Sequence, residues 1–223
     1  MVDGMRTWVS WSSGKDSAWA LHALRQGGEA DVAGLFTTLN AAFDRVAMHA
    51  VRRELVEAQA RGAGLPLHRI EIPHPCSNTD YERIMGAFVA EARSEGVEAM
   101  AFGDLFLADI REYRERQLAG TGIAPLFPLW GRDTRRLAGE MLGAGLVAHV
   151  TCIDPRKLDR SFVGRTFDAA FLADLPAGID PCGENGEFHT FASAGPMFAS
   201  PVPVRTGEVT ERDGFVFADL LPA

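Results

Sequence analysis

The chain has 223 residues, of which 47% are hydrophobic and 23% are charged, a balance typical of globular proteins large enough to bury a core. The formal net charge of −8 argues against a partner nucleic acid held by bulk electrostatic attraction. The three cysteines are too widely spaced for a zinc site, and their odd number argues against a disulfide framework. No signal-peptide pattern and no apolar run of about 18 residues occur, so we expect a cytoplasmic protein that does not enter a membrane.

Apolar runs and helical patterns alternate along the first half of the chain. The apolar runs predict strands at 7–11, 32–39, 68–72 and 97–102. The patterns between and after them predict helices at 16–25, 48–62, 79–96 and 110–118. The third helix opens with a capping-box pattern, Thr79 to Glu82. This alternation indicates βαβ units on a parallel sheet, an α/β fold.

Candidate ligand-binding residues follow three of these strands. Such sheets bind ligands at the carboxyl ends of their strands. The residues that fall there are the loop 12–17, Thr37 and Thr38, and Gly103 and Asp104. Because all of them lie at the same edge of the predicted sheet, we expect them to form one nucleotide site.

The loop after the first strand combines the features of a phosphate site. It consists of Ser12, Ser13, Gly14, Lys15, Asp16 and Ser17. A strand that turns through small residues into a helix directs backbone N–H groups and the positive end of the helix dipole at one point. Lys15 adds a mobile cation, and the serines add hydroxyl donors. The loop is not a Walker A motif, because Val9 occupies a glycine position and Asp16 follows the lysine. A glycine turn that only caps a helix is the alternative.

The alternation of elements ends near residue 125. We therefore expect a nucleotide-binding domain at 1–125 and a smaller domain at 126–223. In the second domain the pattern predicts a helix from Asp133 or Thr134, a strand at 146–153 and a further helix near 162–171. A hairpin of 202–210 and 215–220 follows.

The stretch 180–190 is the second candidate site. Gly183 and Gly186 allow sharp turns that direct Glu184 and Glu187 into one space. His189 and Thr190 add a proton carrier and a hydroxyl. Two carboxylates beside a histidine suit general base catalysis or Mg²⁺ binding, and an acidic surface turn is the alternative.

Four motifs together resemble the diphthine–ammonia ligase family, a branch of the PP-loop (N-type) ATP pyrophosphatases. They are S-S-G-K-D-S at 12–17, F-G-D at 102–104, F-P-L-W at 127–130 and G-E-N-G-E-F-H-T at 183–190. The usual PP-loop is S-G-G-K-D-S, so Ser13 replaces its first glycine. The segment G-D-L-F-L-A-D-I-R-E-Y-R after the fourth strand is similar to bacterial members. The resemblance implies a parallel-sheet PP-loop domain of the adenine-nucleotide α-hydrolase type and a smaller α+β domain carrying E-x-x-E-x-x-T, here Glu184, Glu187 and Thr190.

The resemblance also implies a reaction. A substrate carboxylate of unknown identity attacks ATP, releasing pyrophosphate, and ammonia or another amine displaces AMP. We assign the phosphates to residues 12–17, with Lys15, Glu184, Glu187 and Thr190 as catalytic candidates. The cofactors implied are ATP and Mg²⁺, with Asp16 as the metal ligand and Asp104 as a second candidate. Thr37 and Thr38 should lie near the adenosine, beside Gly103.

The acceptor site is less defined by the sequence. Arg111, Arg114 and His189 are candidates for holding the substrate, and a solvated helix face paired with Glu112 and Glu115 is the alternative for the arginines. Two other functions stay open: a nucleotide-binding sensor without turnover, and a PP-loop sulfur transferase that acts on RNA. The sequence also leaves a homodimer open.

Overall fold

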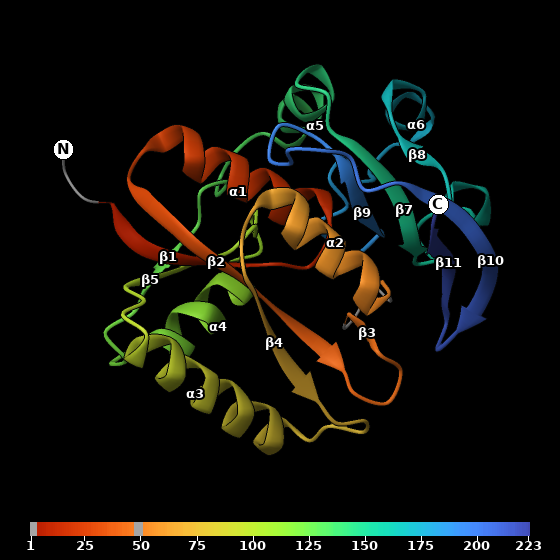
Figure 1. The fold of residues 1–223 in the computed structure, drawn as a ribbon. Coiled ribbons are helices and arrows are strands. Elements are labelled where there is room, and N and C mark those ends of the chain that lie inside the picture. The colour runs from red at the N-terminus through yellow and green to blue at the C-terminus, as the bar shows by residue number, and fades with distance from the viewer. Residues whose placement is uncertain (1–3, 47–50) are drawn as a thin grey trace.

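The computed structural model describes residues 4–46 and 51–223, which form two sheets that share one hydrophobic core (Figure 1). The strands of the first sheet are β1 (Met5–Ser10), β2 (Ala30–Asn40), β3 (Arg45–Val46), β4 (Leu67–Ile72), β5 (Ala99–Ala101) and β6 (Ala124–Leu126). β1 pairs in parallel with β2 and β5, β2 with β4, and β5 with β6, whereas β3 pairs antiparallel with β2. The predicted α/β fold with a parallel sheet is confirmed.

Helices cover both faces of this sheet, because successive side chains of its strands point to opposite sides. Figure 1 shows α1 (Lys15–Gly27) and α2 (Arg53–Ala63) on one face and α3 (Asn78–Ser94) and α4 (Ala108–Leu118) on the other. On β1, Val9 packs in the core on the α1 side, whereas Trp8 packs with Phe88 of α3, their rings 5.7 Å apart.

All four predicted helices of the first half are present. The predicted start of the second one, at 48, lies outside the described residues. The capping box predicted at Thr79 is wrong, because α3 is capped by Ser77, whose Oγ accepts a hydrogen bond from the Asp80 N–H at 3.1 Å. Ser77 lies two residues nearer to the preceding strand and offers the same hydroxyl acceptor.

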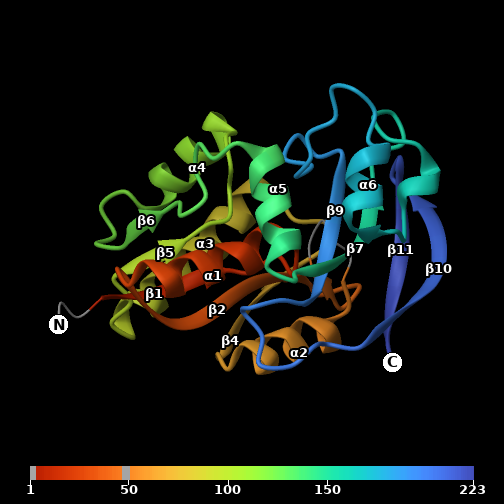
Figure 2. The ribbon, with the colours of Figure 1, turned by 90° about the horizontal axis from the view of Figure 1, so that it is seen from above.

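The second sheet is antiparallel, and β7 (Val147–Ile153) pairs with three of its strands (Figure 2). Its other strands are β8 (Thr166–Phe167), β9 (Phe188–Ala194), β10 (Val204–Arg212) and β11 (Phe215–Pro222). Its helices are α5 (Thr134–Gly143), the 3-10 turn η1 (Arg160–Phe162) and α6 (Ala169–Asp174). The predicted α5, β7 and β10–β11 hairpin are confirmed. The single helix predicted near 162–171 is wrong, because Gly164 adopts φ +79° and β8 separates η1 from α6.

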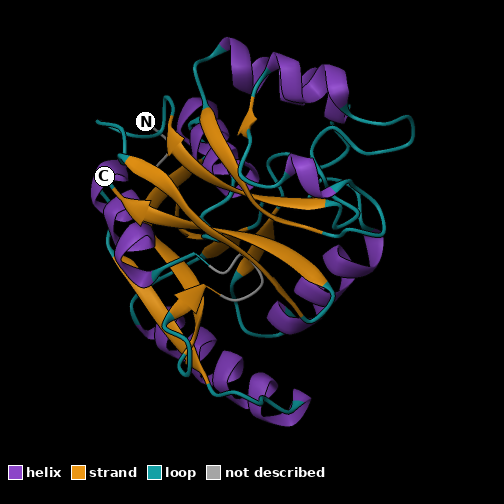
Figure 3. Cartoon of the chain, turned by 90° about the vertical axis from the view of Figure 1, so that its right-hand side faces the viewer, coloured by secondary structure: helices purple, strands orange, loops and turns teal. Residues whose placement is uncertain are grey.

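Polar contacts also connect the two sheets, at the carboxyl end of β1. The Ala192 N–H of β9 donates to the Ser13 carbonyl at 2.9 Å, and the apolar cluster around α1 continues into β7 and β9. Figure 3 shows the strands of both sheets together with the helices that pack around them, of which α1 contacts β2 of the first sheet and β9 of the second. The first sheet ends at Leu126 and the second begins at Val147. In the part of the chain that the structure describes, no helix has the length and apolarity needed to span a bilayer.

Candidate functional site

The loop between β1 and α1 folds tightly around its own serines. Ser12 Oγ accepts from the Gly14 N–H at 3.3 Å and lies 3.2 Å from Ser17 Oγ, which in turn donates to the Gly14 carbonyl at 3.0 Å. Ser13 adopts φ +71°, a conformation that favours glycine. This explains why glycine is usual at that position in the PP-loop pattern. Ser13 Oγ is buried without a hydrogen-bond partner among the described atoms.

Lys15 is not the mobile cation that the sequence predicted. Its side chain is buried, and the ammonium contacts Asp16 Oδ2 at 2.9 Å and the Cys182 carbonyl oxygen. It also lies 5.2 Å from the centre of the Phe188 ring. Burial lowers the pKa of Lys15, but the charge of Asp16, the hydrogen bond to it and the further acidic groups Cys182 and Asp180 together outweigh burial and raise that pKa above its ordinary value. Lys15 is therefore a fixed cation, and one of its acceptors, the Cys182 carbonyl in the turn before β9, cannot be inferred from local sequence.

A cavity of about 240 Å³ lies at the N-terminus of α1, between the two sheets; we call it the loop cavity. It collects most of the predicted site residues from four separate segments. They are Ser12, Lys15, Asp16 and Ser17; Gly103 and Asp104; Arg114; and Glu184, His189 and Thr190. Ser13, Gly14, Thr37, Thr38, Arg111 and Glu187 are not in its lining.

Gly103 allows the loop after β5 to approach α1 closely. A Cβ on Gly103 would lie 2.9 Å from the Asp16 carbonyl carbon and 3.0 Å from the Ser17 nitrogen, both backbone atoms. No larger residue fits there without displacing the first turn of α1. Steric exclusion by the backbone of α1 therefore explains why the F-G-D motif has a glycine at this position.

Three carboxylates face the loop cavity, from Asp16, Asp104 and Glu184. Burial raises the pKa of Asp16 and of Asp104. Burial also raises the pKa of Glu184 to about 7, and the charges of Asp16 and Asp104 act in the same direction. Glu184 Oε1 accepts from the N–H groups of Leu105 (2.7 Å) and Phe106 (3.3 Å), which ties the two motifs together.

The acidic lining fits a divalent cation only in combination with phosphate. Within residues 4–46 and 51–223, no cluster of His, Cys, Asp or Glu has the arrangement of a complete metal site. Mg²⁺ is usually bound by one or two carboxylates together with phosphate oxygens and water. Asp16 Oδ1 is buried and lacks a hydrogen-bond partner among the described atoms, so it is available as such a ligand.

Glu187 and Thr190 have positions that their motif did not reveal. Glu187 is buried outside the cavity, and its Oε1 accepts from the Asp180 N–H at 3.2 Å and from Asn185 Nδ2 at 3.1 Å. It holds the turn that carries Glu184 and does not line the cavity, so of the two predicted candidates for the base only Glu184 faces the cavity. Thr190 Oγ1 accepts from the Lys15 N–H at 3.1 Å, which fixes β9 to the loop.

A second cavity, of about 310 Å³, opens at the end of β2; we call it the strand cavity. Thr37 and Thr38 line it beside the rings of Trp11, Phe36 and Tyr81. It shares Ser10, Ser12 and Arg114 with the loop cavity, so the two cavities adjoin. Thr37 Oγ1 is buried with no partner among the described residues, which leaves one hydroxyl for a ligand.

The two arginines rated as substrate candidates differ in position. Arg114 lines both cavities, 4.0 Å from Asp104 Oδ2 and with its guanidinium 5.0 Å from the Phe102 ring centre. Arg111 lies outside them, bonded to Glu115 at 2.8 Å and stacked on Phe127 and Trp130. Only Arg114 is therefore placed to meet a ligand in these cavities.

Gln59 is a residue that the sequence interpretation missed. Fully buried on α2, it accepts from Trp11 Nε1 at 2.9 Å and donates to the carbonyls of Ser13 (2.9 Å) and Ala192 (2.7 Å). A signal existed, because Gln59 follows Leu55 by four residues and so interrupts the apolar face of α2. Gln59 supports the loop from behind.

Comparison of the sequence with known proteins identifies the family to which the chain belongs. Residues 5–124 match the model of the diphthamide synthase N-terminal domain, and residues 133–217 match that of the diphthamide synthase C-terminal domain. The diphthine–ammonia ligase of Homo sapiens is 26% identical over 184 residues, covering 75% of this chain and 68% of the human one. That of Danio rerio is 27% identical over 231 residues, covering 93% and 89% of the two chains. The chain belongs to the diphthamide synthase family.

Proposed function

We propose that this protein is an ATP-dependent ligase that joins the carboxylate of an acceptor to ammonia or another amine and releases AMP and pyrophosphate. The observation that carries the proposal is the loop cavity, where Lys15 and Thr190, 175 positions apart in the chain, are hydrogen-bonded. The matched diphthine–ammonia ligases support the same class of reaction.

ATP would occupy the two adjoining cavities. The strand cavity has aromatic rings and the hydroxyl of Thr37, which suit an adenosine. The loop cavity has the N-terminus of α1 and the serines of the loop, which suit phosphates. Mg²⁺ held by Asp16 and Asp104 would neutralise phosphate charge. Arg114, which lines both cavities, would lie near the α-phosphate and stabilise the charge that develops there.

The proposed reaction has two steps. A carboxylate oxygen of the acceptor bonds to the α-phosphorus, the bond from that phosphorus to the β-bridging oxygen breaks, and pyrophosphate leaves with an acyl-adenylate remaining. The nitrogen of ammonia then bonds to the acyl carbon, the bond to the AMP oxygen breaks, and one proton leaves the nitrogen. Positioning and electrostatics carry most of the catalysis.

Glu184 is our candidate for the group that receives this proton. Its pKa of about 7 lets it exist as a carboxylate at neutral pH and still bind a proton strongly enough to act as a base. Glu187 would act through Glu184, as a positioning residue that holds the 180–187 turn.

We further propose that residues 1–125 bind ATP, that residues 126–223 supply Glu184, and that the protein acts in the cytoplasm.

The sulfur-transferase alternative requires a reactive thiol. Burial raises the pKa of Cys152 to about 12 and raises the pKa of Cys182 as well, so these two thiols are unreactive, and the half-exposed Cys76 alone does not make the pair of catalytic cysteines that a transferase needs.

Product analysis tests the proposal. The protein is mixed with ATP, Mg²⁺, ammonium and a panel of carboxylic acids, and AMP and pyrophosphate are quantified. Equal amounts of AMP and pyrophosphate that depend on the acid would support the ligase. ADP with inorganic phosphate would contradict it, and ATP binding without products from any acid would favour the sensor.

A further inference from the structure

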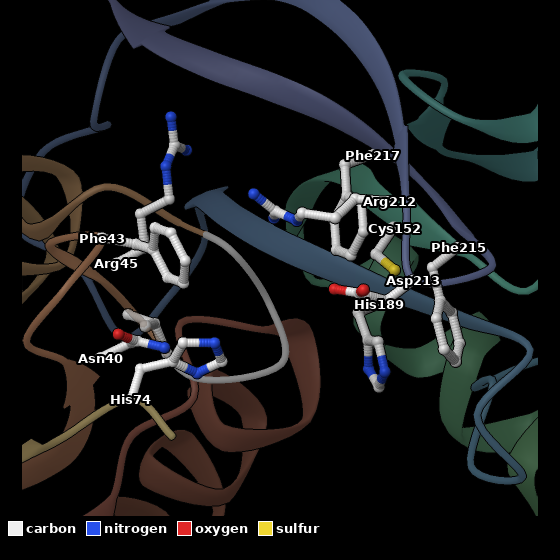
Figure 4. Close-up of a pocket in the computed structure, with 11 residues that line it drawn as sticks. Asn40, Phe43, Arg45, His74, Cys152, His189, Arg212, Asp213, Phe215 and Phe217 are labelled. Atoms are coloured by element: carbon white, nitrogen blue, oxygen red, sulfur yellow. The ribbon is translucent and has the colours of Figure 1, made fainter. Parts of the chain in front are cut away.

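We propose that a third cavity, beside the β10–β11 hairpin, binds the acceptor, and that this acceptor is a small carboxylic acid with an apolar, ring-sized body. We call it the hairpin cavity; its volume is about 270 Å³. Figure 4 shows Phe43, Arg45 and His74 on one side of it and Arg212, Phe215 and Phe217 on the other. The inference rests on the proposed function, because it names the substrate class of that reaction.

The hairpin cavity adjoins both of the cavities in which ATP is proposed to bind. The hairpin cavity shares His189 with the loop cavity and Val46 with the strand cavity, so all three meet at the seam between the sheets. In this proposal the carboxylate of a molecule bound in the hairpin cavity points toward His189 and the adjoining loop cavity. Burial and the charge of Lys15 lower the pKa of His189 to about 4, so the ring that both cavities share is neutral at pH 7.

Aromatic rings line two sides of the hairpin cavity. Phe43 is 50% exposed, unusual for so large an apolar side chain, and it stands opposite Phe215 and Phe217. Rings on both sides of a cavity favour a flat or branched hydrocarbon body between them. The volume lies at the low end of small-molecule sites, which favours a single small acid.

The charged side chains that line the hairpin cavity include the guanidinium of Arg212. The guanidinium of Arg212 lies 4.8 Å from the Phe217 ring centre and 5.9 Å from that of Phe43, so it lies between the two sides of the cavity, where it can meet an anion. No ion pair involving Arg212 is found among the described residues, whereas Arg45 pairs with Asp219 at 2.8 Å. Among the described lining residues, Asp213 is acidic and Arg45 and Arg212 are basic, and Arg45 shares the carboxylate of Asp219 with Arg52. The balance favours an anion and disfavours an amine.

The test uses 4-fluorophenylacetate as the probe, followed by ¹⁹F NMR line broadening on the full chain, with the uncharged 4-fluorophenylacetamide for comparison. The variant Arg212→Met removes the cation and keeps the length of the side chain. Arg205→Met is the matched control, because Arg205 is an exposed residue of the same strand that does not line the cavity. Affinity for αβ-methylene ATP is measured on each protein by calorimetry.

We expect the acid to bind at least about tenfold more tightly than the amide, and Arg212→Met to lose about that factor. Arg205→Met should bind as the wild type does, and both variants should keep nucleotide affinity. Failure of the acid to bind, or equal binding to Arg212→Met and the wild type, would overturn the inference. Failure of the wild type to bind the nucleotide would instead overturn the proposed function, so the two failures are distinguishable.

Discussion

Replacing Gly103 by alanine tests whether the approach of the β5 loop to α1 shapes the nucleotide site. The new Cβ would lie 2.9 Å from the Asp16 carbonyl carbon and 3.0 Å from the Ser17 nitrogen. Because both contacts are with backbone atoms, one segment must move by about 0.5 Å to restore van der Waals distance. Overpacking of this kind costs about 1–3 kcal/mol, and it misdirects the N–H groups at the start of α1.

We therefore expect Gly103→Ala to weaken binding of αβ-methylene ATP by about 10- to 100-fold, measured by calorimetry with Mg²⁺. Urea unfolding on the same sample should show that the variant is folded and has lost about 1–3 kcal/mol of stability. Gly86→Ala is the control, because Gly86 lies inside α3 and a Cβ there meets nothing within 4 Å. It should keep ATP affinity and gain about 0.5–1 kcal/mol. Wild-type affinity in a folded Gly103→Ala variant would refute the reasoning.

Three further variants test the groups around the loop cavity. Because burial raises the pKa of Glu184 to about 7, AMP release should rise with pH through about 7 in the wild type and lose that rise in Glu184→Gln; an unchanged profile would contradict the base role. The same raised pKa, against an ordinary value of 4.5, means that the wild type should lose stability relative to Glu184→Gln as the pH rises from 4.5 to about 7 in urea unfolding. Lys15→Met should cost about 1–3 kcal/mol in the same assay, since it leaves the half-buried carboxylate of Asp16 without its partner, and an unchanged stability would argue that the pair does not form in solution. Gln59→Leu should cost about 1–3 kcal/mol by leaving Trp11 Nε1 without its acceptor, and an unchanged unfolding midpoint would rule out its supporting role.

Local patterns predicted the first half of the fold well, because buried parallel strands and amphipathic helices differ in period and each ends at a recognisable turn. The second half was harder. Gly164 adopts φ +79° and divides what reads as one helix into η1, β8 and α6. The short strand β6 was missed because Pro125 lies at its centre, and a proline argues against a strand in a sequence pattern.

The sequence was enough to predict which residues meet at the candidate site, but not which way their side chains point. The motifs at 12–17, 102–104 and 183–190 meet in one cavity, as the ends of strands in such a sheet should. The side-chain direction of Lys15 depends on the Cys182 carbonyl, 167 positions away, and no local rule contains that contact. Glu187 turns inward for a different reason: it accepts hydrogen bonds from Asp180 and Asn185 of its own turn, and the motif alone does not show how that turn folds.

A crystal structure with αβ-methylene ATP and Mg²⁺ tests the central claim most directly, because this analogue cannot be cleaved between its α- and β-phosphates. We expect β- and γ-phosphates bonded to the backbone and hydroxyls of residues 12–17, the adenosine beside Thr37 and Thr38, and Mg²⁺ on Asp16. We also expect the α-phosphate beside Arg114, in the adjoining region of the two cavities. Phosphates bound away from the 12–17 loop, or an adenosine outside the strand cavity, would show that ATP does not bind as proposed.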